Sequence, residues 1–245
     1  LAKTRRGSPH FALPVLVGGL AAHGGALVVF TARHGDLPLA GLGPALSSLA
    51  FLSATAMLVA GVLKEARPLG AVVLPFAAVL VGVALLLGIE PGESVAFGGV
   101  WFYFHVVPSL LGYAALALAS AAGLLYLLQF RELKGKRFGR MFRFLPPLET
   151  LDRVGRIALV SGLVALTLGL LAGTVWTMTF AAAGLTPKVA WGVLTWLVFV
   201  VALLARRKGM TGDRRAALVS VVGFVVVVVA YLVLRLAEPA GRLFL

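Results

Sequence analysis

The chain has 245 residues, of which 60% are hydrophobic and 13% are charged, and it carries a formal net charge of +13. Soluble domains have about 25% charged residues, so this composition excludes an ordinary soluble domain and predicts an integral membrane protein. There is no cysteine, which excludes disulfides, thiolate catalysis, iron–sulfur clusters and covalent haem attachment to this chain.

Runs of about 20 apolar residues are long enough to cross a bilayer as helices. Seven such runs follow one another: Phe11 to Thr31, Leu42 to Leu63, Leu69 to Ile89, Trp101 to Leu128, Ile157 to Met178, Val189 to Ala205 and Ala216 to Leu234. The valine-rich last run is predicted to be helical too, because a backbone in lipid must form its hydrogen bonds within its own segment. The predicted fold is therefore all-α, a polytopic membrane helix bundle of about seven transmembrane helices that forms one membrane domain over residues 1–245.

Charge predicts how the bundle is oriented. The first run lacks a clear cleavage pattern, so we expect an uncleaved span rather than a signal peptide. Of the 22 lysines and arginines, 18 fall on one side of the predicted spans and 4 on the other, which places the N-terminus in the cytoplasm and the C-terminus outside. Residues 129–156 then form a basic cytoplasmic loop in which PPLETLDR marks the start of a short helix. The same bias accounts for the net charge, so nucleic acid is not an expected partner.

Ionisable residues inside a span are costly and therefore mark candidate sites. The predicted spans contain two histidines, His23 and His105, and no carboxylate. The absence of an acidic relay weakens a proton-coupled transporter. Without paired carboxylates or a nucleophile beside a base, an enzyme is not expected either.

His23 lies among small residues in the run GGLAAHGGAL. Two interpretations are open for this position. The histidine forms a hydrogen bond to a neighbouring helix in a tightly packed core, or the small residues leave room for a flat ligand such as haem, whose iron the imidazole would bind.

His105 directly follows the aromatic cluster Trp101 to Phe104. This pattern fits either an aromatic belt at the outer interface or a ligand-binding cluster. At a rise of 1.5 Å per residue, His23 would lie roughly 12 Å and His105 roughly 6 Å from the outer ends of their spans, so the two could approach a common plane. The spacing of Gly169 and Gly173 predicts a close helix contact.

Four longer segments carry a family resemblance. They are HVVPSLLGYAALALASAAGLLYLL, PPLETLDRVGRIALVSGLVALTLGLLAGTVW, PKVAWGVLTWLVFVVALLARR and GDRRAALVSVVGFVVVVVAYLVL, in that order. Together they resemble the cytochrome c assembly family of haem-handling membrane proteins, and most nearly its HemX-like branch. The resemblance implies a haem-binding surface at the outer leaflet, in which His105 matches a flanking ligand. The expected haem b site comprises His105 and His23 as iron ligands, with Trp101, Trp176 and Trp191 against the macrocycle.

The sequence also departs from the family pattern. Between Trp176 and Pro187 it reads TMTFAAAGLT, so the WWD residues that present haem in the synthetases are missing. Two further family histidines and an initial span are expected to be missing as well. The first hypothesis is therefore an accessory haem-handling protein of a bacterial cytoplasmic membrane, without full haem-ligase machinery.

Two alternatives stay open. One is a structural subunit of a larger respiratory or photosynthetic membrane complex, derived from the same family. The other is a small-molecule exporter. The expected partners are membrane lipids and other membrane proteins of cytochrome assembly or of an electron-transfer complex.

Overall fold

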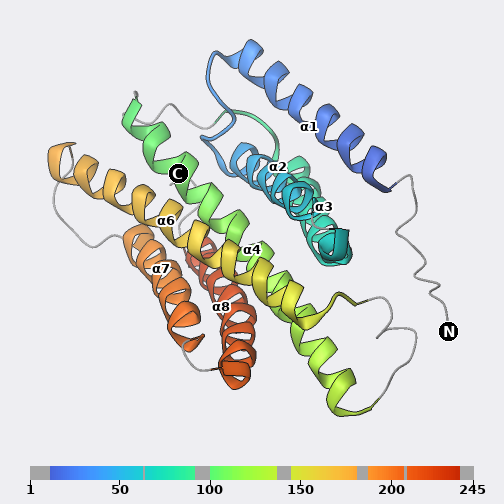
Figure 1. Cartoon of the computed structure of the whole chain (residues 1–245). Helices are drawn as coiled ribbons and strands as arrows, with labels where there is room; N and C mark the ends of the chain where they lie inside the picture. The colour runs from blue at the N-terminus through green and yellow to red at the C-terminus, as the bar shows by residue number, and fades with distance from the viewer. Residues whose placement is uncertain are drawn as a thin grey trace.

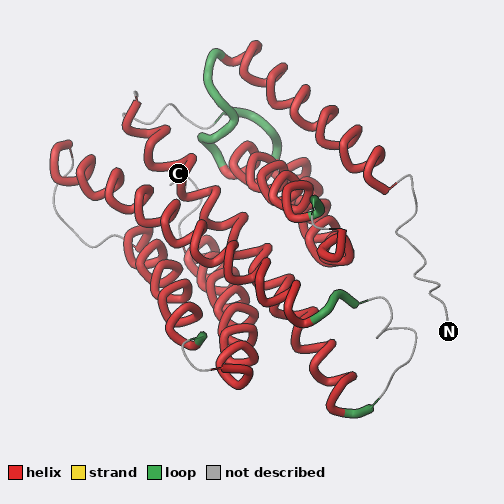
Figure 2. The backbone as a smooth tube through the Cα atoms, viewed as in Figure 1, coloured by secondary structure: helices red, strands yellow, loops and turns green. Residues whose placement is uncertain are grey.

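The computed structural model describes residues 12–62, 64–91, 100–136, 145–180, 187–206 and 209–237. Within these ranges the chain forms seven α-helices and one short 3-10 helix, without a strand (Figure 2). They are α1 (Ala12–His34), α2 (Leu42–Ala60), η1 (Lys64–Leu69), α3 (Gly70–Leu87), α4 (Val100–Lys134), α6 (Leu148–Phe180), α7 (Pro187–Ala205) and α8 (Gly209–Ala237). The prediction of an all-α fold is confirmed.

Each of the seven predicted apolar runs coincides largely with one α-helix. Six of these helices are long and apolar enough to cross a membrane, and the seventh, α7, contributes the shorter apolar segment Val189–Ala205. The chain is therefore a multi-pass membrane helix bundle. Which terminus faces the cytoplasm stays a prediction.

Helices α4 and α6 lie side by side at the centre of the bundle and run antiparallel (Figure 1). His105 near the start of α4 faces Gly173 near the end of α6, and further along Gly112 faces Leu166. Helices α2 and α8 pack against α4, and α7 packs against α6 and α8. Helix α3 lies on α2, and α1 is outermost.

Glycine makes the central contact close. A Cβ atom added at Gly162 of α6 would lie 2.5 Å from the ring of Phe199 and 2.8 Å from Ala115. Real Cβ atoms do not approach other atoms so closely, so α4, α6 and α7 can meet here only because this position has no side chain. The middle of α4 is accordingly the most buried part of the bundle.

The two central helices are longer than their predicted spans. With 35 residues in α4 and 33 in α6, each is about 50 Å long at 1.5 Å per residue, whereas the hydrocarbon core is about 30 Å thick. Helix α6 begins at Leu148, directly after two prolines, and continues without interruption into the fifth span. The helix start predicted from PPLETLDR is thus the first turn of α6 rather than a separate short helix. Residues 137–144 of the predicted loop lie outside the described residues.

Candidate functional site

His105 lies near the start of α4, half-buried against α6. Its Nδ1 atom is 2.7 Å from the carbonyl oxygen of Gly169. A carbonyl oxygen only accepts hydrogen bonds, so Nδ1 carries the proton and donates it. In the neutral ring Nε2 is then unprotonated, and no hydrogen bond from the described residues reaches it. An unprotonated imidazole nitrogen held in this way is the usual form of a metal-binding histidine.

Two glycines of α6 make room for this ring. A Cβ atom at Gly173 would lie 2.7 Å from Nδ1 and 2.9 Å from Cε1 of His105. At Gly169 it would lie 2.5 Å from Oγ of Ser109, one turn after the histidine. The glycine pair that was predicted only as a helix contact therefore surrounds His105, a link that the sequence interpretation missed.

An aromatic edge lies beside His105. Trp101 is four residues before the histidine, so both lie on one face of α4, and its side chain is 49% exposed. The rings of Trp101 and Phe104 are 6.4 Å apart, and Phe104 is exposed as well. The backbone of Trp176 lies near the end of α6, three residues after Gly173, but its side chain is outside the described part. The structure thus places Trp101 near His105.

Trp191 belongs to a different environment. Its indole N–H donates to the carbonyl oxygen of Val227 over 3.1 Å. Its ring lies 4.7 Å from that of Tyr113 and 5.4 Å from that of Tyr231. The side chain therefore joins α7 to α4 and α8 inside the bundle, which is a packing role.

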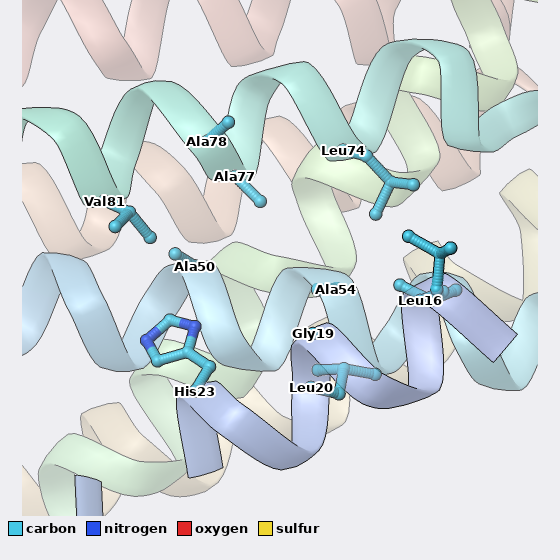
Figure 3. Close-up of a pocket in the computed structure, with 11 residues that line it drawn as sticks. Leu16, Gly19, Leu20, His23, Ala50, Ala54, Leu74, Ala77, Ala78 and Val81 are labelled. Atoms are coloured by element: carbon cyan, nitrogen blue, oxygen red, sulfur yellow. The ribbon is translucent and has the colours of Figure 1, made fainter. Parts of the chain in front are cut away.

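His23 lies on α1, and its Nε2 is 2.9 Å from Oγ of Ser47 on α2. The ring also contacts Phe51 edge to face, with centroids 5.6 Å apart. Figure 3 shows the imidazole directed from α1 toward a groove that α2 and α3 line with small side chains, among them Ala50 and Ala77. The volume of this groove is about 230 Å³, below the roughly 300–1,000 Å³ of typical ligand pockets. The hydrogen bond to a neighbouring helix agrees with one part of the first interpretation of His23, but the ring does not lie in a tightly packed core, because most of α1 is exposed.

The two histidines pack against different helices. His23 is hydrogen-bonded to α2, whereas His105 is hydrogen-bonded to α6. Figure 1 shows α1 on the outside of α2, with α4 and α6 on the other side of it. The structure therefore gives them separate environments and does not support one iron shared by both.

A larger apolar groove lies between α1, the α1–α2 connection, α2 and α4. Its volume is about 500 Å³, which is within the range of ligand pockets. Val107 and Leu110 of α4 form one side of it, and Phe51 and Leu39 form others. Because His105 points to α6, this groove lies on the other face of α4 from the imidazole.

A charged contact that the sequence interpretation missed joins α6 to the residue after α7, at the end of the bundle away from His105. Arg206, directly after α7, forms an ion pair with the carboxylate of Asp152 and also donates to its backbone carbonyl oxygen. The two side chains are 12% and 24% exposed. In the sequence, Asp152 belongs to the run PPLETLDR, which predicts only a helix start. The sequence does contain one signal for this ion pair: both residues flank apolar runs on the same predicted side of the membrane.

Residues 42–239 match the family model described as cytochrome C assembly protein. The chain belongs to the cytochrome c assembly protein family. The match includes His105, Trp101, Trp176 and Trp191, and it begins at the first residue of α2. His23 on α1 lies outside it.

Individual relatives agree with the family match. The cytochrome c biogenesis protein CcsA of Chlamydomonas reinhardtii is 33% identical over 137 residues, which cover 54% of this chain and 37% of the relative. The CcsA protein of Microcystis aeruginosa is 29% identical over 252 residues, with 81% and 76% covered. An uncharacterised 28.8 kDa protein of Azospirillum brasilense is 31% identical over 191 residues, with 76% and 68% covered. The chain spans half or less of the length of the first CcsA relatives that it matches.

Proposed function

We propose that this member of the cytochrome c assembly family is a haem-binding or haem-handling accessory protein that works without the full haem-ligase machinery. The observation that carries the proposal is the Nδ1–H tautomer of His105. Its Nδ1 proton is donated to Gly169, and in the neutral ring Nε2 keeps its lone pair. The donor chemistry therefore fits a ligand of haem iron.

The surroundings of His105 also suit a flat macrocycle. Trp101 and Phe104 are exposed, apolar and on the adjoining surface of α4. We expect His105 to bind the iron through Nε2 and Trp101 to lie against the ring. Trp176 is proposed as a further contact from the end of α6. The group is expected to be haem b, which when bound would supply an iron for His105 to bind. Because this chain has no cysteine, the haem would be held non-covalently.

The accessory role rests on the sequence between Trp176 and Pro187. The stretch TMTFAAAGLT has neither tryptophan nor aspartate, so the WWD-type residues of the synthetases are missing. This supports a HemX-like member that binds or handles haem and leaves its transfer to other proteins. We propose the bacterial cytoplasmic membrane as its location, and membrane proteins of cytochrome assembly as its partners.

His23 is proposed as a separate, secondary candidate ligand. Its Nε2 is engaged by Ser47, so iron binding there would use Nδ1, or would require the Ser47 contact to open. The groove beside it is small. We therefore expect a larger effect from removing His105 than from removing His23.

A second function is favoured by the tryptophans of α7. Trp191 donates to Val227, and Trp196 donates to Oγ1 of Thr167 over 2.9 Å, so both indoles serve contacts between helices. A structural subunit of a larger membrane complex that has lost haem would keep such contacts between helices. Co-purification of the tagged chain with other membrane proteins at fixed stoichiometry, together with failure to bind haem, would favour this alternative.

Haem titration into the purified protein tests the first proposal. We expect the wild-type protein to develop a Soret band that saturates, and His105→Ala to lose high-affinity binding. His34→Ala is the matched control, because His34 is exposed at the end of α1 and packs on Phe30. Equal binding by wild type and His105→Ala would contradict the assignment of the ligand, and no binding by wild type would contradict the proposed function.

A further inference from the structure

The imidazole of His105 is in direct contact with the backbone of α6. Nδ1 of His105 is 2.7 Å from the carbonyl oxygen of Gly169. A Cβ atom at Gly173 would lie 2.7 Å from the same Nδ1, and one at Gly169 would lie 3.1 Å from the backbone oxygen of His105. The imidazole therefore lies directly on the backbone of one turn of α6.

The acceptor in this contact is a carbonyl inside a helix. Its ordinary partner is the N–H group four residues later, which belongs to Gly173. A carbonyl oxygen has two lone pairs, so it can accept the proton of His105 in addition. The ring can reach this oxygen only if the residue one turn later in α6 has no side chain, and that residue is Gly173.

We infer that Gly169 and Gly173 are positioning residues which, through the Gly169 carbonyl and the open surface of Gly173, fix the Nδ1–H tautomer of His105 and leave Nε2 free for a ligand. This inference rests on the proposed function for its purpose, but the tautomer itself does not depend on haem. A backbone acceptor that orients a histidine and raises the basicity of its other nitrogen is a common feature of metal sites. Neither glycine touches the ligand in this account.

The matched pair of variants is Gly173→Ala and Gly162→Ala. Both add one methyl group to α6 at a position where Cβ meets atoms of the neighbouring helices at less than 3.0 Å. Only the first meets the ring of His105, whereas the second meets Phe199 and Ala115. Gly82→Ala is the neutral control, because nothing lies within 4 Å of its Cβ.

The decisive experiment is 15N NMR of histidine-labelled protein without haem, with the His105 signals assigned by comparison with His105→Ala. We expect the Nδ1–H tautomer in wild type, Gly162→Ala and Gly82→Ala, and its loss in Gly173→Ala. An Nε2–H tautomer in wild type would overturn the inference, even if Gly173→Ala does not fold. So would an unchanged tautomer in a folded Gly173→Ala protein.

Haem titration separates this inference from the proposed function. Loss of an orienting partner weakens metal binding about 10–100-fold, so we expect that loss in Gly173→Ala but not in Gly162→Ala. Equal affinity in Gly173→Ala would overturn the positioning role, whereas haem binding itself would still stand. A wild type with the Nδ1–H tautomer but no haem binding would remove the proposed function and keep the positioning of His105.

Discussion

The ion pair between Asp152 and Arg206 gives the most direct prediction about stability. Asp152→Asn removes the carboxylate charge that pairs with Arg206, whose side chain is only 12% exposed. Breaking a fully buried pair costs about 3–5 kcal/mol. Asp152 is 24% exposed, and its backbone carbonyl still accepts from Arg206 in the variant, so we expect a loss of about 1–2 kcal/mol. At about 2–4 °C per kcal/mol for a chain of this size, the melting temperature should fall by about 2–8 °C.

Thermal unfolding of the detergent-purified protein, followed by circular dichroism, measures this change. The control is Glu149→Gln, which removes an exposed carboxylate from the first turn of α6 and should lower the melting temperature by less than Asp152→Asn, because an exposed charge at a helix N-terminus contributes only about 0.3–1 kcal/mol. Replacing both partners, as in Asp152→Leu with Arg206→Met, should recover much of the loss, since no unpaired charge is left behind. Equal melting temperatures for Asp152→Asn and Glu149→Gln would refute the reasoning.

Two other substitutions test the packing. Trp191→Phe keeps an aromatic ring but removes the hydrogen bond to Val227. The free energy of unfolding should therefore fall by about 1 kcal/mol, while the affinity for haem stays unchanged. A large loss of haem affinity would show that the indole contacts the ligand. Gly43→Ala puts a methyl group onto the backbone carbonyl of Gly88, so the start of α2 must move away from the end of α3. We expect a clear loss of folded yield relative to Gly82→Ala, and equal yields of the two variants would contradict this close contact.

Hydropathy was enough to place the helices but not to fix their ends. The apolar run of α4 stops at Leu128, yet the helix continues to Lys134 because the polar residues that follow are good helix formers. Proline at the start of α6 is a local signal, and the helix begins where that signal predicts. Length, composition and prolines are properties of neighbouring residues, which is why the sequence reveals them.

The candidate site depends instead on contacts between distant residues. His105 and Gly169 are 64 residues apart, and Arg206 and Asp152 are 54 apart. Which side chain a glycine pair admits depends on the register of α4 against α6, and that register is set by the packing of the whole interface. The sequence therefore identified the histidine and the glycines separately, without connecting them. Likewise, the family resemblance placed Trp191 against a haem macrocycle, whereas in the structure its ring contacts Tyr113 of α4 and Tyr231 of α8, which are distant in the sequence.

The central claim is that His105 holds haem in this protein. It is tested most directly by the absorption spectrum of the purified protein, oxidised and reduced, beside that of His105→Ala prepared in the same way. We predict a Soret band and a reduced-state spectrum of haem b in the wild type, with both lost from the variant. A wild-type protein that is colourless and takes up no added haem, or a variant whose spectrum matches the wild type, would contradict the account.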